Sequence, residues 1–565
     1  MLDAQNLTVL LFIAAAVAAV VFVFVYQKRQ TSARIWRRIR TTYGKRPDRE
    51  YDYDEFDAIS HYSRQKQEKE AFYLDDITWN DLEMDTIFML LNHTWSSIGE
   101  SYLYHLLRTP VFTREEVEQR NRLITYFQEH PKERENLEYF FANVGKTGRY
   151  SVFDFIYNMA DYAQENPWKE LVWTGAVILM AALIFLRPEY GILGLIVVII
   201  ASWSNYYKKK KKIEPYIMSC SYLLHILKAA KKLEGKNIGP AEPYLEVIRA
   251  SRRKLSRIKR NSFFLVAGSM DSGMSGGLEK VIVDYLNFTF HIDLMQFAFM
   301  VKTLRDNLDS FEELTESMGI LECATACASF REMMQEWCVP EFSTEKVFSA
   351  ENMYHPMIQE PVKNSISVEK GVLLTGSNAS GKSTFLKTAA INAVLAQTIG
   401  TCMADRYGSG FFRIYSSMAL RDDLTGQESY YIVEIKSLKR ILDQIGGEKP
   451  VLCFIDEVLR GTNTVERIAA SSQILKSMGN GNVLCFAATH DVELTHILEG
   501  IYENYHFQEE VQDNEILFDY KLYQGRATSR NAIRLLHIMG YADDIIRAAE
   551  ESARYFMEKG TWKEM

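Results

Sequence analysis

Three long runs without a charged residue interrupt an otherwise mixed pattern of hydrophobic and polar positions. They cover Leu7–Tyr26, Leu171–Leu186 and Gly191–Tyr207. A helix of about 20 apolar residues crosses the hydrocarbon core of a bilayer, so the first run predicts a membrane anchor. Only Arg187–Tyr190 separates the other two runs, which therefore predict a membrane hairpin. Leu171–Leu186 is short for a complete span, and a shallow re-entrant course stays open for it.

Basic residues follow the first and third runs. The stretch 27–46 is dense in Lys and Arg, and five consecutive lysines, Lys208–Lys212, follow the hairpin. Flanks rich in Lys and Arg lie in the cytoplasm, so both clusters predict the same topology. A cleaved signal peptide is the alternative for the first run, but no Lys or Arg precedes that run. We expect a multi-pass protein of the cell membrane that contacts membrane lipids, with the bulk of the chain cytoplasmic.

Outside these runs, the pattern changes along the chain from helices to alternating strands and helices. Helical patterns dominate up to about residue 345. Beyond it, short apolar strands at Val372–Thr375, Val451–Val458 and Asn482–His490 are each followed by polar residues. This order predicts a multidomain chain, in which an α-helical region with transmembrane helices precedes a carboxy-terminal α/β domain.

The first of these strands leads into a phosphate-binding loop. Residues 376–383 follow the pattern Gly-x4-Gly-Lys-Ser, and a helical pattern comes next. In such a loop, backbone N–H groups cradle phosphates, the lysine reaches the β and γ phosphates, and the hydroxyl ligates Mg²⁺. The predicted nucleotide-binding residues are Gly376, Ser377, Asn378, Ala379, Ser380, Gly381, Lys382, Ser383 and Thr384. The sequence thus predicts a P-loop ATPase with ATP and Mg²⁺ as its cofactors.

Two acids and a histidine follow the other two strands. Asp456 and Glu457 come at the end of Val451–Val458, where a parallel sheet positions catalytic groups. Asp456 is predicted to hold the metal together with Ser383, and Glu457 to deprotonate the attacking water. His490 is predicted to sense the γ-phosphate as the second catalytic residue. The alternatives are acids that only cap a strand and a structural histidine.

Composition and charge limit the remaining function classes. The 565 residues are 47% hydrophobic and carry a net charge of −8, so general disorder and a whole-molecule preference for nucleic acid are excluded. The seven cysteines lack metal-ligand spacing, which predicts free thiols, and Cys323 and Cys327 are expected to be packing residues. The basic helix Arg249–Arg260 leaves three interpretations open: contact with DNA, contact with anionic lipid, or a solvated face.

Four segments resemble the ATPase domain of the MutS family, which recognises mismatched DNA. They are Thr375–Thr384 (TGSNASGKST), Asp422–Ile435 (DDLTGQESYYIVEI), Asp456–Thr464 (DEVLRGTNT) and Ala488–Thr495 (ATHDVELT). The resemblance implies an ABC-related fold with composite nucleotide sites, and hence a homodimer. It also implies that Ser429 reaches the nucleotide of the opposite subunit, although Tyr430 stands where the family has threonine. A helix N-cap is the alternative for Ser429.

Weaker resemblance extends into the helices. Asp81–Phe127 resembles the start of the family's lever region, and Ser310–Phe342 resembles the long helix that leads to its ATPase domain. Residues 27–75 are too short and too charged for the family's mismatch-reading domain. Three Phe-x-Glu strings, Phe127–Glu129, Phe311–Glu313 and Phe330–Glu332, lie in helical patterns, so we expect their aromatic residues to be packing residues. The predicted parts are an anchor (1–26), a cytoplasmic linker (27–75), a first helical part (76–167), the membrane hairpin (168–207), a second helical part (208–345) and the ATPase domain (346–565).

The resemblance and the apolar runs together imply a membrane-anchored ATPase whose helical levers respond to ATP. DNA is a candidate partner of such a protein. The alternative is an ATP-driven membrane signalling or mechanical element without DNA binding. A transporter is the weakest candidate, because the two apolar runs of the hairpin contain no charged residue that would line a path.

Overall fold

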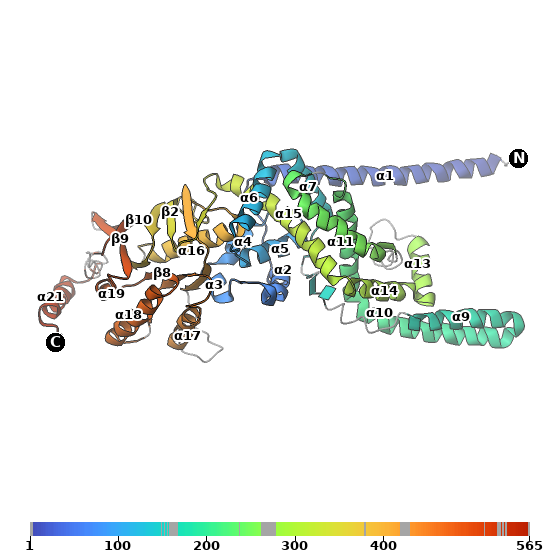
Figure 1. Cartoon of the computed structure of the whole chain (residues 1–565). Coiled ribbons are helices and arrows are strands. Elements are labelled where there is room, and N and C mark those ends of the chain that lie inside the picture. The colour runs from blue at the N-terminus through green and yellow to red at the C-terminus, as the bar shows by residue number, and fades with distance from the viewer. Residues whose placement is uncertain are drawn as a thin grey trace. The chain divides into compact units, whose positions relative to one another are not determined.

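The chain forms two compact units in a computed structural model (Figure 1). Unit 1 comprises Met1–Glu68, Leu91–His105 and Arg122–Met333, and unit 2 comprises Lys69–Leu90, Leu106–Asn121 and Met334–Met565. The described residues are 4–148, 150–151, 153–154, 156–157, 168–236, 238–260, 278–377, 380–418, 430–460, 462–512, 515–527, 533, 536 and 540–562. Of these, 4–21, 24, 169, 214–215, 217–218, 257, 259–260, 278–283, 430, 510–512, 515–516 and 557 are described by their backbone alone. The multidomain class, with a mostly helical amino-terminal region and α/β sheets towards the carboxyl terminus, is confirmed.

Helices make up the described part of unit 1. They include α1 (Ala4–Thr42), α2 (Tyr53–Lys66), α5 (Ser97–Arg108), α6 (Arg114–Glu129), α7 (Pro131–Val144), α9 (Trp168–Leu186), α10 (Pro188–Leu233), α11 (Glu242–Arg260), α13 (Leu278–Phe290), α14 (Ile292–Arg305) and α15 (Leu308–Met334), with short 3₁₀ turns at Gln67–Lys69 and Gly239–Ala241. The Phe-x-Glu strings lie on α6 and α15, and their aromatic residues Phe127, Phe311 and Phe330 are fully buried. Cys323 and Cys327 are also buried, so the packing role expected for all of these residues is confirmed.

The predicted first span falls inside α1, which continues to Thr42 as one helix. The carboxy-terminal half of α1 packs on α7, where Trp36 stacks on Tyr139 with 4.7 Å between ring centroids and Ser32 shares a hydrogen bond with the Tyr139 hydroxyl. The stretch expected as a linker contributes α2, whose Ile59 and Tyr62 are buried in unit 1. It is folded into this unit because these apolar side chains recur on one face of the helix.

The predicted hairpin forms two helices that lie side by side, α9 and α10 (Figure 1). They approach closely because glycines face the partner helix: a Cβ atom at Gly191 would lie 2.5 Å from the backbone nitrogen of Ile184. Among the residues whose side chains the structure describes, Pro188–Ile213 is the one helical segment long and apolar enough to cross a membrane, and Glu170–Leu186 is a shorter apolar helix. The apolar side chains of the hairpin point outward, with Phe185 91% and Leu193 65% exposed.

The lysine block lies within α10 and does not end it. The helix runs for 46 residues, about 70 Å, from the hairpin into the rest of unit 1, which is called the helical unit below. Lys209 forms an ion pair with Glu170 of α9, and Lys210 forms one with Asp293 of α14. Two of the five lysines therefore have structural partners in addition to the topological role expected from the sequence.

Unit 2 contains two sheets. The larger sheet has the strand order β10-β9-β4-β8-β7-β6 and is parallel except for the β9–β10 hairpin. The smaller sheet has the strand order β1-β5-β2-β3. The strands are β1 (Glu341–Ser343), β2 (Phe348–Met353), β3 (Asn364–Val368), β4 (Gly371–Thr375), β5 (Arg406–Gly410), β6 (Arg413–Ser417), β7 (Val451–Asp456), β8 (Val483–Ala488), β9 (Tyr502–Gln512) and β10 (Glu515–Gln524). Its helices are α3 (Asp76–Asp81), α4 (Met84–Leu91), α16 (Lys382–Ile399), α17 (Tyr430–Leu442), α18 (Thr464–Asn480), α19 (Val492–Ile497) and α21 (Asp543–Lys559).

The basic stretch at Arg249 belongs to α11, which begins at Glu242. Arg249 forms an ion pair with Glu242, and Arg252 forms one with Glu234, so two of its cations already have carboxylate partners. Arg253 and Lys254 are exposed. The Gly/Ser/Met segment 268–277 lies outside the described residues.

Candidate functional site

The predicted site lies at one edge of the larger sheet. Strands β4, β8 and β7 are parallel neighbours in that order, so their carboxyl ends meet at the same edge. The phosphate-binding loop follows β4, the two acids follow β7, and His490 follows β8. The sequence-predicted elements are therefore brought together as a parallel sheet requires.

Two glycines shape the loop between β4 and α16. Gly376 has a φ of 147° and Gly381 a φ of 104°, a region that other residues rarely adopt. A Cβ atom at Gly376 would also lie 2.9 Å from the carbonyl oxygen of Phe507. The ammonium group of Lys382 lies inside the loop and donates to the carbonyl oxygens of Gly376, at 2.9 Å, and Ser377, at 2.8 Å. The described part of the predicted loop thus combines two glycines in conformations that only glycine adopts readily with a lysine directed inward.

The two predicted metal ligands are in contact. The Ser383 hydroxyl donates to the Asp456 carboxylate across 2.6 Å. Ser383 lies in the first turn of α16, and Asp456 is the last residue of β7. A hydroxyl and a carboxylate at this separation supply oxygen atoms of the kind that Mg²⁺ prefers.

Glu457 follows Asp456 and leaves the strand abruptly. Its φ is 62°, which explains why β7 ends at Asp456 and not at Val458 as the apolar pattern suggested. The Glu457 carboxylate is held on both sides: Oε1 lies 2.9 Å from Nε2 of His490, and Oε2 lies 2.8 Å from Nε of Arg460. A left-handed conformation outside glycine costs about 1–2 kcal/mol, and such strain gathers at functional sites.

Two pKa shifts set the charge of this edge. The hydrogen bond with His490, helped by the charge of Arg460, outweighs burial and lowers the pKa of Glu457, so its carboxylate is ionised at neutral pH. Burial lowers the pKa of Lys382, although Asp456 and Glu457 oppose that shift. The site therefore combines an ionised carboxylate with a buried ammonium group.

Glu434 on α17 supports the loop that carries Glu457, a role that sequence reasoning did not assign. Its buried carboxylate accepts hydrogen bonds from the backbone N–H groups of Leu459, at 2.6 Å, and Arg460, at 3.1 Å. Leu459 has a φ of 63°, so these bonds hold a second strained residue. Glu434 belongs to the segment Asp422–Ile435, and the resemblance of that segment to MutS was the signal in the sequence that could have indicated a role for Glu434.

Tyr520 is a second residue that the sequence did not reveal. A Cβ atom at Gly381 would lie 3.2 Å from its ring, so Tyr520 of β10 lies against the phosphate-binding loop. Glu509 of β9 also contacts this loop through the Ser377 hydroxyl. The β9–β10 hairpin has no motif that would have indicated either contact.

Some predicted site residues lie outside the described part of the chain. These are Asn378 and Ala379 of the loop and the trans-site residue Ser429. Of the others, Ser380 is buried, while Ser383 and Thr384 are exposed at the start of α16. The assignments of individual roles stay predictions.

The residues present fit a nucleotide with Mg²⁺. The hydroxyl oxygen of Ser380 is buried in the loop without a hydrogen-bond partner among the described residues, which a phosphate oxygen would satisfy. Lys382 and the N-terminus of α16 supply positive charge to the same place. The Ser383–Asp456 pair supplies the oxygen donors for the metal.

Comparison with known proteins agrees with this geometry. The model of the family described as MutS domain V matches residues 372–557, a range that includes the loop, Asp456, Glu457 and His490. Residues 372–557 are therefore similar to MutS domain V. Relatives of the chain include the DNA mismatch repair protein MutS of Streptococcus uberis, 27% identical over 281 residues, and that of Pseudothermotoga lettingae, 30% identical over 224 residues. The human MutS protein homolog 4 is 26% identical over 324 residues.

The family relationship extends over part of each protein. The matches cover 46%, 38% and 53% of this chain, and 32%, 27% and 33% of the three relatives in the same order. The chain thus matches about a third of the length of these curated relatives. The segment that matches MutS domain V carries the site described above.

Proposed function

We propose that this protein is a MutS-type ATPase that works as a homodimer and transmits ATP-driven changes through its helical unit to a membrane hairpin. The observation that carries the ATPase assignment is the arrangement at the sheet edge. Ser383 and Asp456 are in hydrogen-bond contact, and Glu457 is oriented by His490 and Arg460 beside them.

In this mechanism, each residue has a separate task. Lys382 turns from the loop carbonyls to the β and γ phosphates of bound ATP. Bound Mg²⁺ would neutralise developing charge on the phosphates, and Ser383 and Asp456 would hold it there. Glu457 accepts a proton from the attacking water, for which its ionised state prepares it. His490 keeps the Glu457 carboxylate turned towards the site.

The hairpin supports a membrane location. Its apolar side chains are exposed on both helices, and only 17% of the most apolar stretch of Pro188–Ile213 is buried, unlike a core helix of a soluble domain. Burial of such a surface in lipid is favourable. With Leu7–Tyr26 as a further span, the lysine block lies on the cytoplasmic side, as the positive-inside rule requires.

Buried polar contacts join the hairpin base to the helical unit. Glu170 of α9 contacts His291 at 2.6 Å, and the second ring nitrogen of His291 lies 2.9 Å from the hydroxyl of Ser202 on α10. Tyr206 of α10 donates to Asp293 of α14 across 2.7 Å. Breaking a buried pair of this kind costs several kcal/mol, so the hairpin base and α14 move together.

Substitution of Glu457 tests the ATPase assignment. The Glu457→Gln variant should bind ATP normally and hydrolyse it about 10²–10⁴-fold more slowly, because only the proton acceptor is lost. Glu448→Gln makes the same chemical change at an exposed position of unit 2 and should leave the rate unchanged. An unaltered rate in Glu457→Gln would refute the catalytic assignment. A Glu457→Gln variant that stays monomeric with ATP would refute the composite dimeric site.

Two further measurements separate the remaining parts of the proposal. The ATPase rate of detergent-solubilised protein should respond to mismatched DNA, because two relatives are named DNA mismatch repair proteins, and branched DNA is tested beside it. No binding at low salt would remove DNA from the proposal. The full chain should resist extraction from membranes by alkaline carbonate. Its release would refute the hairpin's insertion without affecting the ATPase.

A further inference from the structure

Unit 1 contains a cavity of about 770 Å³ that the proposed ATPase mechanism does not use. Its walls are the carboxy-terminal part of α1, the segment 45–49 that follows it, the segment 92–95 before α5, and the residues around Gly145 after α7. All of these belong to unit 1. The volume is within the range of about 300–1,000 Å³ that is usual for small-molecule sites.

The α1 wall is basic because of the spacing of its cations. Arg34 and Arg38 are four residues apart, so they lie on one helical face, and Lys45 and Arg46 follow where the helix has ended. All four are exposed, and in the part of the chain that the structure describes none of them has a carboxylate partner. Asp48 is the one carboxylate among the described lining residues, so these side chains leave an excess of positive charge.

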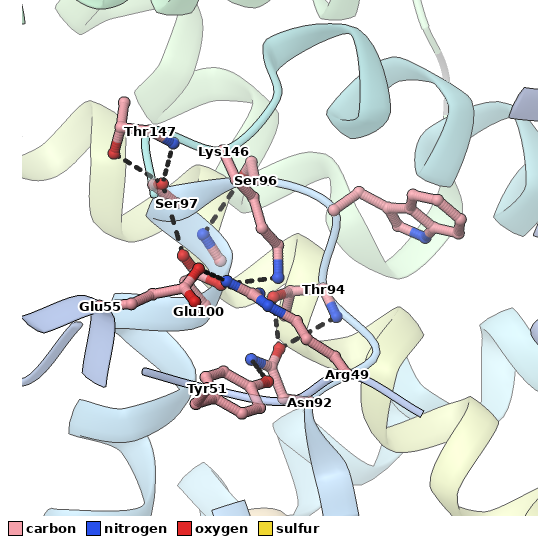
Figure 2. Close-up of polar contacts among 12 residues, drawn as sticks. Arg49, Tyr51, Glu55, Asn92, Thr94, Ser96, Ser97, Glu100, Lys146 and Thr147 are labelled. Carbon is pink, nitrogen blue, oxygen red and sulfur yellow. Dashed lines mark hydrogen bonds and ion pairs between the residues drawn. The ribbon is translucent and has the colours of Figure 1, made fainter. Parts of the chain in front are cut away.

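Two more lining cations are fixed in place by the buried Glu100 and the partly buried Glu55 (Figure 2). The Glu100 carboxylate is 1% exposed and pairs with Lys146 at 2.6 Å and with Arg49 at 2.7 Å, and Arg49 also pairs with Glu55. Burial alone would raise the pKa of Glu100, but Lys146 and Arg49 outweigh it and hold the pKa below its ordinary value. Glu100 and Glu55 therefore hold Lys146 and Arg49 in place at the inner wall and neutralise their two positive charges.

Polar and aromatic groups complete the lining. Asn92 accepts from the N–H and hydroxyl groups of Thr94, at 3.2 and 2.5 Å, and donates to the Tyr51 hydroxyl, so its orientation is fixed (Figure 2). The Nε2 atom of His93 is buried and has no hydrogen-bond partner among the described residues. Trp95 lines the same cavity, and the guanidinium group of Arg38 lies 5.5 Å from its ring centroid.

We propose that this cavity binds a ligand with two or more phosphate groups, through Arg34, Arg38, Lys45 and Arg46. Guanidinium groups match phosphate oxygens in paired hydrogen bonds, and the uncompensated charge favours a polyanion. His93 offers the ligand one further hydrogen bond. The cavity is too small for duplex nucleic acid, which leaves a soluble phosphorylated molecule or the headgroup of an anionic lipid as its source.

The position of the cavity makes both sources accessible. Arg34 follows Tyr26, the end of the predicted span, by eight residues, or about 12 Å along α1. A headgroup in the cytoplasmic leaflet would reach this wall, and a soluble phosphate would reach it from the cytoplasm. The chemistry of recognition is the same in the two cases, so the source is decided by experiment.

The test uses the full chain with the substitution Lys382→Ala, which removes the P-loop lysine as a competing phosphate contact. Titration calorimetry in neutral detergent with inorganic pyrophosphate probes the soluble source. Nanodiscs of phosphatidylcholine with and without cardiolipin, whose headgroup carries two phosphate groups, probe the lipid source. The double substitution Arg34→Gln/Arg38→Gln should weaken binding by about tenfold or more, since two charged contacts are lost.

A matched control comes from the same helix. Arg29 and Arg37 are exposed on α1 but do not line the cavity, so Arg29→Gln/Arg37→Gln makes the same change in net charge. This control should bind within about twofold of the parent, and Lys45→Gln, which lies beyond the helix, should weaken binding without affecting helix stability. Equal losses in both double variants, or no saturable binding of either probe, would overturn the proposal. ATP hydrolysis by variants that retain Lys382 should stay unchanged, which separates this site from the ATPase.

Discussion

Replacement of Glu322 by Gln should make unit 1 more stable at pH 8 and leave its stability nearly unchanged at pH 5. Glu322 lies on α15 and is 0% exposed. Its carboxylate accepts from the backbone N–H groups of Trp95, at 2.5 Å, and Ser96, at 2.8 Å, and from the Ser96 hydroxyl. Burial nevertheless dominates and raises its pKa from 4.5 to about 7.

The sign and the size follow from that pKa. A raised carboxyl pKa means that the folded protein holds the proton more tightly than the unfolded chain does. The stabilising contribution of protonated Glu322 to the free energy of unfolding is therefore complete below pH 4.5 and is lost as the pH rises through 7. The loss amounts to about 3 kcal/mol over this window. Glutamine keeps the acceptor for the two backbone N–H groups and never ionises, so the variant avoids the loss.

Thermal unfolding followed by tryptophan fluorescence measures the effect. At about 2 °C per kcal/mol for a unit of this size, Glu322→Gln should melt about 6 °C above the parent at pH 8, and within about 2 °C of it at pH 5. Glu332→Gln, an exposed change on the same helix, should show no pH-dependent difference. A difference of equal size at both pH values would refute the assignment to ionisation, and a lower melting temperature at pH 8 would show that the hydrogen bonds outweigh burial.

Two further predictions concern close packing and the catalytic loop. Gly319→Ala should destabilise unit 1 by about 1–3 kcal/mol, because the added Cβ would lie 2.5 Å from the Tyr102 ring; an unchanged melting temperature would contradict that contact. Glu434→Gln should lower the kcat for ATP on the order of tenfold with little change in nucleotide affinity, since it weakens the hydrogen bonds that hold Leu459 and Arg460. If a fluorescent nucleotide showed a change in affinity while kcat stayed the same, the proposed role of Glu434 in holding the loop at Leu459 and Arg460 would be refuted.

The site was predictable where its signal is local. The loop at Gly376 follows from the eight consecutive positions 376–383 and their flanking strand and helix, and the meeting of Asp456 with Ser383 follows from the parallel order of the strands. The conformation of Glu457 was not predictable, because its φ of 62° results from the packing of the loop that Glu434 holds.

Tertiary placement explains the remaining gaps. The basic cavity combines Arg34, Asn92 and Lys146, which lie in segments far apart in the sequence and have no common motif. The course of α10 was missed for a different reason. Hydropathy changes abruptly at Lys208, which suggested a boundary, but lysine is a good helix former, so the helix continues unchanged through the lysine block.

The continuity of α10 determines where movement can pass between the helical unit and the hairpin. The helix is anchored at the hairpin base by Lys209 with Glu170 and by Lys210 with Asp293, while Cys220 and Leu223 are buried further along it. Pro215 lies between these two sets of contacts and cannot donate the backbone hydrogen bond that a helix interior requires. Bending of α10 is therefore easiest at this position. In the proposed mechanism, ATP-driven movement that reaches the helical unit would change the angle at Pro215, while the anchored hairpin and α14 would follow it as one body.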